Sequence, residues 1–270
     1  MTPGASVAVT RAMAVAALAI LLGGCHAASR PPAAVQGSYR LDWHDEFEGA
    51  TLDSSKWAHY APGPRRLAIN VPEAVALDGR GHLTITTTRH EVPDGAGGLK
   101  TEYRTGMIST RGIYETTYGY FECRMRVQRE VGHWSAFWIN TPTMGKPMGD
   151  PAAAGVEIDV MEYLCNGDYK DKAQHTIHWD HKTPAYQRDF TALHIPGLGE
   201  GLHVYGCEWT PDYLAFFVDG RETWRTSKAI PKRDQHIILS VEIGPWAGDI
   251  KEANLPDGIE VDYVRVFKRR

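Results

Sequence analysis

The strongest constraint on the fold is a long series of short segments in which apolar and polar residues alternate, with no helical pattern between them. Turn signals such as Asp94-Gly95 and Asp219-Gly220 separate segments rich in β-branched and aromatic residues. This series predicts an all-β fold, a sandwich or jelly roll of two antiparallel sheets. The expected strands are residues 83–88, 106–109, 113–117, 120–127, 133–139, 156–163, 175–179, 203–209, 214–218, 237–242 and 258–267.

One of these segments, residues 157–162, contains three carboxylates separated only by apolar side chains. Side chains of a strand point alternately to its two faces, so Glu157 and Asp159 share a face and a regular strand would turn Glu162 away. One extra residue, taken up as a β-bulge near Val160-Met161, would return Glu162 to the face of Glu157. Bulges of this kind are common beside active sites.

The spacing of the two glutamates can be estimated. With the bulge, Glu157 and Glu162 are in effect four strand positions apart, roughly 13 Å along the backbone. If the two side chains lean toward each other, their carboxyl groups are about 5 Å apart, the separation used by retaining glycosidases. The alternative is a solvated acidic strand face, but the apolar residues between the acids indicate a packed sheet.

The first 24 residues have the features of an export signal. Arg11 supplies positive charge, and the apolar run at residues 12–22 is too short to span a bilayer. The run ends in Leu22-Gly23-Gly24-Cys25, which resembles the bacterial lipobox, in which the cysteine is lipidated. The alternative is an ordinary secretory signal that is cleaved, for example, after Ala27. We expect an exported protein anchored to the bacterial envelope through Cys25, or else a secreted or periplasmic one.

Residues 25–37 are expected to form a tether, and residues 38–270 one large β domain that folds as a monomer. The formal net charge is only −4 and no basic block is present, which gives no reason to expect nucleic acid as a partner. If Cys25 is lipidated, Cys123, Cys165 and Cys207 remain, and they cannot all pair within the chain.

Five stretches of the chain carry a resemblance to glycoside hydrolase family 16, the concanavalin-like jelly rolls that cleave β-glucans and β-galactans. The resemblance extends from about Leu41 to Phe267, and in GHWSAFW the residue Ser135 replaces the proline usual in the family. The stretches are Leu41–Phe47 with Leu52–Trp57, Tyr118–Arg124, Gly132–Trp138, Glu157–Glu162 and Val261–Val266.

The resemblance implies catalytic roles for the three acids. Glu157 matches the nucleophile and Glu162 the acid/base, while Asp159 lies between them and raises the pKa of a neighbouring carboxyl group. We therefore expect Glu162 protonated and Glu157 ionised in the free enzyme. The mechanism that the resemblance implies requires no cofactor.

Several residues are candidates for substrate binding. Trp134 and Trp138 share a strand face and could line a cleft; the alternative is that they are core residues. The series His175, His178 and His181 could suggest a metal site, but a strand would place His175 and His178 on opposite faces. The resemblance favours a position for His178 near the acid/base, and a structural role is expected for the other two histidines.

The resemblance also suggests sugar contacts for Asn70, Arg104, Glu242 and Trp246. Asn70 could instead be a turn residue, and Glu242 could be buried and paired, since a charged residue there departs from the family pattern. The loop at residues 141–154 is expected to shape the cleft.

Many members of the family bind a structural calcium ion, for which Glu48 and Asp262 would be the side-chain ligands in this chain. The alternative is that these are ordinary surface acids and a paired strand aspartate.

The substrate expected first is β-1,3-linked or mixed-linkage glucan, cleaved internally with retention. The bulged pattern ExDxxE resembles laminarinases, agarases and related galactanases. A β-galactanase of the agarase or porphyranase type is the alternative, and Arg65, Arg66 and Arg104 are the basic residues that would favour it. A noncatalytic carbohydrate-binding surface lipoprotein on the same fold is a third possibility, as is transglycosylation.

Overall fold

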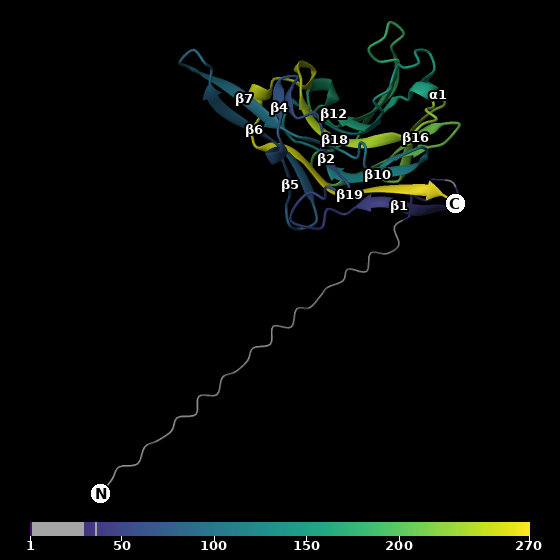
Figure 1. Ribbon diagram of the computed structural model, residues 1–270, viewed down its shortest axis with the longest axis horizontal. Coiled ribbons are helices and arrows are strands. Elements are labelled where there is room, and N and C mark those ends of the chain that lie inside the picture. The colour runs from purple at the N-terminus through teal and green to yellow at the C-terminus, as the bar shows by residue number, and fades with distance from the viewer. Residues whose placement is uncertain (2–29, 36) are drawn as a thin grey trace.

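Two large sheets packed face to face form the molecule (Figure 1), in a computed structural model that describes residues 1, 30–35 and 37–270. The all-β prediction is confirmed. The expected signal segment and Cys25 lie outside the described residues. Among the residues that are described, none of the helices combines the length and the apolar character needed to cross a membrane.

The larger sheet contains eleven strands: β1 (Tyr39–Asp45), β3 (Gly63–Arg65), β4 (Ala68–Asn70), β5 (Val75–Leu77), β6 (Leu83–Pro93), β7 (Leu99–Thr105), β10 (Gly119–Arg126), β15 (His203–Trp209), β16 (Leu214–Val218), β17 (Arg221–Thr226) and β19 (Asp257–Arg269). Their spatial order is β17-β16-β15-β10-β19-β6-β7-β4-β3, with β1 also paired to β19 and β5 to β6. The hairpin of β6 and β7 projects beyond the sandwich (Figure 1).

The smaller sheet contains eight strands: β2 (Ala58–His59), β8 (Met107–Ser109), β9 (Glu115–Thr116), β11 (His133–Asn140), β12 (Glu157–Tyr163), β13 (Lys172–Trp179), β14 (Gln187–His194) and β18 (Gln235–Ile243). Their order is β14-β13-β12-β11-β18-β8-β2, and β9 pairs with β18. Helical structure in the described chain is limited to α1 (Pro151–Ala154) and four short 3₁₀ turns, Pro72–Ala74, Gly167–Tyr169, Pro245–Ala247 and Ile250–Glu252.

Alternation of side chains divides each sheet into an inner and an outer face. Phe121 and Cys123 of β10 and Phe137 and Ile139 of β11 belong to one buried cluster between the sheets. Each large apolar side chain that is fully buried there contributes about 1.5–3 kcal/mol. The alternate side chains of the same strands point to the outer face of the smaller sheet, which is called the cleft face below.

The sequence did not predict several strands: β1–β5, β7, β14 and β17. Most of these are short or lie where solvent reaches them, so they lack a clear apolar face. The turn between β16 and β17 does follow the sequence signal, because Asp219 (φ 49°) and Gly220 (φ 76°) both adopt the positive φ that a tight hairpin requires.

The end of the expected tether packs on the domain. Val35 is buried with Tyr120 and Phe217 on the outer face of the larger sheet. The chain therefore enters the fold on the side opposite the cleft face. The three cysteines within the domain, Cys123, Cys165 and Cys207, are all buried and free.

Candidate active site

The catalytic strand β12 contains the bulge that the sequence predicts. On β13, Asp159 is opposite Thr176 and Glu162 is opposite Gln174, so three steps along β12 match two along β13. On the other side, Met161 pairs with Phe137 and Asp159 pairs with Trp138, which leaves Val160 as the extra residue. Glu162 is thereby returned to the cleft face that Glu157 and Asp159 share.

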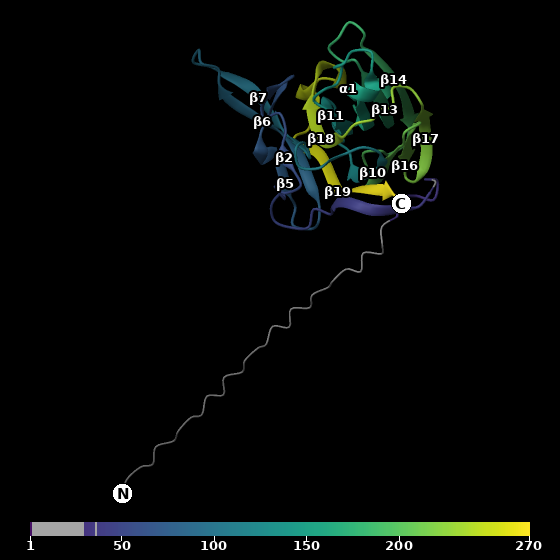
Figure 2. The same cartoon turned by 45° about the vertical axis from the view of Figure 1, so that its right-hand side comes forward.

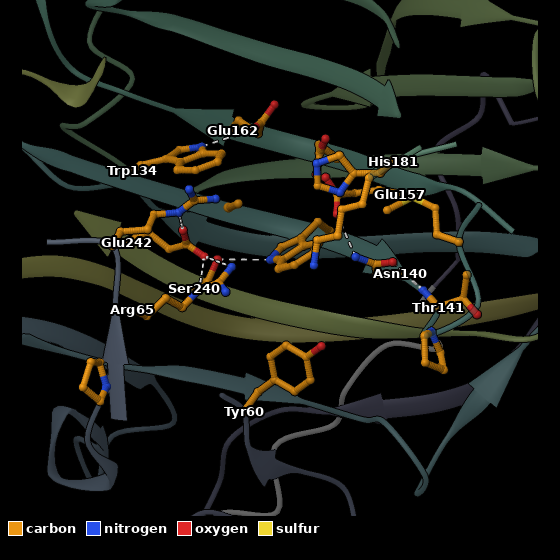
Figure 3. Close-up of a pocket in the computed structure, with 18 residues that line it drawn as sticks. Tyr60, Arg65, Trp134, Asn140, Thr141, Glu157, Glu162, His181, Ser240 and Glu242 are labelled. Atoms are coloured by element: carbon orange, nitrogen blue, oxygen red, sulfur yellow. Dashed lines mark hydrogen bonds and ion pairs between the residues drawn. The ribbon is translucent and has the colours of Figure 1, made fainter. Parts of the chain in front are cut away.

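A cleft of about 680 Å³ lies over this part of the cleft face (Figure 3). It brings together the three acids of β12, two tryptophans of β11 and residues of the β3 and β18 strands. Its lining residues are Tyr60, Pro64, Arg65, Arg66, Trp134, Ala136, Trp138, Asn140, Thr141, Pro142, Met144, Glu157, Asp159, Glu162, His181, Lys182, Ser240 and Glu242. The expectation that the loop at residues 141–154 shapes the cleft agrees with the positions of Thr141, Pro142 and Met144.

Glu162 is held by one donor from each neighbouring strand. The indole Nε1 of Trp134 donates to Oε1 at 3.0 Å, and the Thr176 hydroxyl donates to Oε2 at 2.7 Å. Burial raises the pKa of Glu162, and these two hydrogen bonds oppose that shift. A carboxyl group with a raised pKa in a fixed position suits a general acid.

Glu157 accepts a hydrogen bond from the Asn140 amide, which lies 2.7 Å from Oε2. Burial, and then the charge of Asp159, raise the pKa of Glu157 to about 8. Burial also raises the pKa of Asp159 well above its usual value. The three acids therefore titrate as a coupled set rather than with Glu157 simply ionised and Glu162 protonated. The Asn140 amide and the nearby His178 favour negative charge on Glu157 within that set.

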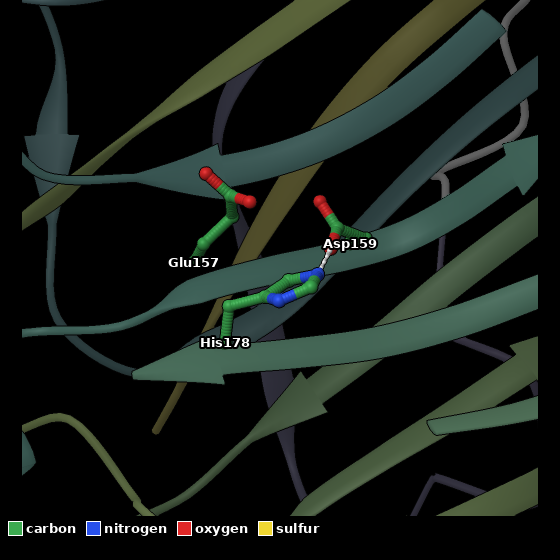
Figure 4. Close-up of side chains that lie close together, drawn as sticks. All are labelled: Glu157, Asp159 and His178. Atoms are coloured by element: carbon green, nitrogen blue, oxygen red, sulfur yellow. Dashed lines mark ion pairs between the residues drawn. The ribbon is translucent and has the colours of Figure 1, made fainter. Parts of the chain in front are cut away.

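His178 approaches Asp159 from β13 (Figure 4), with 3.3 Å between Nε2 and Oδ2. Its other nitrogen, Nδ1, lies 2.7 Å from the hydroxyl of Tyr186, whose ring stacks on the imidazole. Ligand atoms of Glu157, Asp159 and His178 lie within 4.8 Å of one another. His175 points to the core on the opposite face, so the three histidines do not form one metal site.

Both tryptophans of β11 line the cleft, as expected. Trp138 is buried in its floor and donates to the Ser240 hydroxyl at 3.1 Å. Trp134 meets the half-exposed Trp246 edge to face, with 5.3 Å between ring centroids. The guanidinium of Arg66 lies over both rings, 4.9 Å from that of Trp134 and 4.8 Å from that of Trp246.

Glu242 is a buried, paired acid, which is one of the two alternatives left open by the sequence. Its Oε1 accepts from Arg65, with Nε at 2.6 Å and Nη2 at 2.5 Å, and its Oε2 accepts from Nε of Arg66. The pairs fasten the β3–β4 hairpin to β18 at the edge of the cleft. Two guanidinium groups share one carboxylate, so this cluster, which we call the Arg65–Arg66 clamp, carries net positive charge.

Asn70 and Arg104 do not line the cleft, contrary to expectation. Asn70 is 4% exposed, ends strand β4 and donates to the Ala61 carbonyl, so its role is structural. Arg104 pairs instead with Glu102 at 2.8 Å.

The structure adds residues that the sequence analysis did not assign to the site. Asn140 and Lys182 were missed, and His181, for which a structural role was expected, lines the cleft. Asn140 could have been found, because it continues the alternation of Trp134 and Trp138 along β11.

The residues expected to bind calcium do not fit such a site. The carboxylate of Asp262 pairs with the Arg124 guanidinium at 2.5 Å, which leaves a cation beside the proposed ligand. Glu48 is exposed.

The family model described as "Beta-porphyranase A-D, GH16 domain" matches residues 42–269. The chain belongs to glycoside hydrolase family 16. It is thus a glycoside hydrolase, and the five sequence stretches that resembled family 16 fall almost wholly within the matched region.

Curated proteins and solved structures resemble most of the chain. A beta-glucanase from Rhodothermus marinus is 29% identical, with 85% of each chain covered. A keratan-sulfate endo-1,4-beta-galactosidase from Sphingobacterium multivorum is 27% identical, and the match covers 85% of this chain but 55% of that protein. The laminarinase catalytic domain of Thermotoga maritima superposes with a TM-score of 0.71 at 26% identity, covering 86% of this chain and 99% of that one.

Proposed function

We propose that the protein is a retaining endo-β-glycanase that cleaves β-1,3-linked or mixed-linkage glucan. The observation that carries the proposal is the bulge at Val160, which places Glu157, Asp159 and Glu162 on one face of an open cleft. An open cleft bordered by aromatic rings can accept the middle of a long sugar chain.

The reaction takes place in two displacements. A Glu157 oxygen attacks the anomeric carbon while Glu162 gives its proton to the departing glycosidic oxygen, and a glycosyl ester forms. Glu162, now ionised, takes a proton from water as the water oxygen attacks the same carbon and releases Glu157. Asp159 can hold a proton beside Glu157. His178 lies next to the carboxyl group of Asp159 and is its partner.

The substrate class is supported by the names of the relatives. The Rhodothermus marinus relative is called a beta-glucanase, and the Thermotoga maritima domain a laminarinase. Both matches extend over most of this chain, and both support a glucan as the substrate.

A β-galactan, in particular a sulfated one, is the second candidate. The description of the matching family model names porphyranases. The cleft also contains the Arg65–Arg66 clamp together with Lys182 and His181. The two arginines and Lys182 are cations that suit an anionic polysaccharide, whereas burial lowers the pKa of His181. Arg104, which the sequence suggested for the same purpose, does not contribute.

The test is a screen of the purified protein against laminarin, mixed-linkage glucan, agarose, porphyran and carrageenan. Product size and initial anomeric configuration are measured by chromatography and NMR. We expect mixed oligosaccharides with retained configuration, and a Glu157→Gln variant that binds the substrate without cleaving it. Initial inversion would contradict the retaining mechanism, whereas cleavage of galactans alone would reverse the order of the two substrates.

We also propose that the chain is exported as a monomer and lipidated at Cys25. The proposal is supported by the apolar run at residues 12–22 and by the lipobox-like Leu22–Cys25. Mass spectrometry of the mature protein should find a diacylglyceryl group on an N-terminal Cys25, and Cys25→Ser should release the protein from the membrane fraction. A mature N-terminus beyond Cys25 would contradict the anchor.

A further inference from the structure

The smaller sheet continues beyond the catalytic strand β12 to β13 and the edge strand β14, both of which are labelled in Figure 2. The cleft residues come from β3, β11, β12, β18 and adjoining loops, and among the described residues none comes from β13 or β14. An endo-acting enzyme holds its polysaccharide on both sides of the bond that it cleaves. A polysaccharide that crosses the strands of this sheet would have its sugar units on one side of that bond over β13 and β14.

The register of these strands identifies the side chains that such sugars would meet. Thr176 donates to Glu162 and so belongs to the cleft face, and its partner on β14 is Phe190. His178, which contacts Asp159, has Arg188 as its partner. Directly opposed residues of an antiparallel pair point to the same face. Phe190 and Arg188 therefore lie on the cleft face beside the catalytic centre.

Aromatic side chains are exposed at this point. Phe190 is 54% exposed and Tyr186, two residues before Arg188, is 43% exposed. The Arg188 guanidinium lies 5.0 Å from the centre of the Phe190 ring, and the Tyr186 ring stacks on His178. The two rings thus offer exposed aromatic surface beside the catalytic centre, on which a sugar can pack.

We propose that Tyr186, Arg188 and Phe190 form a sugar-binding platform for the part of the polysaccharide that extends away from the cleft. The inference rests on the proposed function. The C–H faces of a sugar pack on aromatic rings, and the guanidinium can donate to ring hydroxyls. With about 4.8 Å between neighbouring strands, β14 lies about 10 Å from β12, beyond the sugar unit at the scissile bond.

The platform is tested with Phe190→Ala, using Phe190→Tyr and Gln187→Ala as controls. Tyrosine keeps the aromatic ring, and Gln187 lies on the opposite face of the same strand. The substrates are long and short laminarin oligosaccharides labelled at the reducing end, or the porphyran series if the screen reverses the substrates. Phe190→Ala should raise KM for the long oligosaccharide about tenfold, a loss equal to about 1.4 kcal/mol of binding. It should also shift the position of cleavage, whereas Phe190→Tyr, which keeps the ring, should retain most of the affinity and Gln187→Ala should behave like the wild type.

Binding in the Glu157→Gln background separates this inference from the proposed function. Wild-type protein that cleaves none of the polysaccharides contradicts the proposed function. Equal affinity for the long oligosaccharide with and without Phe190, together with an unchanged cleavage pattern, contradicts the platform. An equal loss on long and short substrates, accompanied by a lower melting temperature, also contradicts it, because that is the result of a structural role.

Discussion

The imidazole Nδ1 of His175 lies 2.7 Å from the carbonyl oxygen of Val160, the extra residue of the catalytic strand. The other nitrogen, Nε2, lies 2.9 Å from the hydroxyl of Thr223 on β17, in the opposite sheet. Burial lowers the pKa of His175 to about 4, so the ring is neutral near pH 7. Nδ1–H then donates to Val160, and Nε2 and the Phe216 carbonyl oxygen share the proton of the Thr223 hydroxyl. The bulge that aims Glu162 is therefore tied across the core.

We predict that His175→Leu impairs the general acid more than the nucleophile. The Val160 carbonyl loses its donor, at a cost to stability of about 1–3 kcal/mol, and Glu162 loses its fixed position. Polysaccharide turnover should fall about 10- to 100-fold, part of the contribution that general acid catalysis makes. An aryl glycoside with a good leaving group needs no proton from Glu162, so its cleavage should fall much less.

The matched variant for this prediction is Thr223→Val, which leaves His175 and its bond to Val160 in place and removes the hydroxyl that contacts His175 Nε2 and the Phe216 carbonyl. It should produce a smaller effect of the same kind. If His175→Leu slows both substrates by the same factor, the histidine stabilises the fold without positioning the acid.

The pKa of Glu157 gives a prediction for stability. Because its pKa is raised from 4.5 to about 8, the native protein disfavours the ionised form. Below pH 4.5 both native and unfolded states are protonated at this residue, and the ionisation penalty is absent. As the pH rises from 4.5 to 8, the unfolded state ionises first and the native state loses relative stability.

The Glu157→Gln variant cannot ionise at that position, so it should escape this loss. Its melting temperature should be close to that of the wild type at pH 4 and above it at pH 8, as measured by calorimetry at both values. A difference that is largest at pH 4 would show that the pKa of Glu157 is not raised.

Side-chain alternation predicted much of the active site. It placed Trp134 and Trp138 on one face and required an extra residue before Glu162. Asn140 belongs to the same alternating set but falls one residue beyond the predicted end of the strand at 139, so an error at a strand boundary concealed a partner of the nucleophile.

Contacts between distant parts of the chain could not be predicted in this way. Arg65 and Glu242 are separated by 177 residues, and no local pattern indicates that they meet. Tyr186 lies outside every predicted strand, and β14 presents polar residues at its start. Asn70 was chosen from the family pattern, and its burial against Ala61 depends on how the β3–β4 hairpin folds back.

The position of Arg66 in the Arg65–Arg66 clamp leads to a prediction for substrate affinity. Arg66→Ala removes the cation that lies over Trp134 and Trp246 and one partner of Glu242. We expect KM to rise about two- to fivefold, because the Arg66 guanidinium holds the Trp134 and Trp246 rings in place and a partly exposed cation–aromatic contact contributes about 0.5–1 kcal/mol. Arg66→Lys retains the charge but not the flat guanidinium, and should restore only part of the affinity.

Salt dependence also distinguishes the two candidate substrates. For an anionic galactan, added salt should weaken binding by the wild type and have less effect on Arg66→Ala. For a neutral glucan, salt should affect both proteins equally. A wild-type KM for laminarin that rises steeply with salt would contradict the proposed role of the clamp.

The contact between the Tyr186 hydroxyl and His178 leads to a prediction for kcat that is separate from sugar binding. When the hydroxyl donates to Nδ1 of His178, the N–H of the ring lies on Nε2, which faces Asp159. Tyr186→Phe keeps the stacked ring but removes this donor. We expect kcat to fall about three- to tenfold, the effect of losing one hydrogen bond of about 1 kcal/mol, with KM unchanged. Phe190→Ala should show the opposite pattern, with KM raised and kcat on short substrates retained. If Tyr186→Phe changes KM alone, its hydroxyl contacts the sugar and does not orient His178.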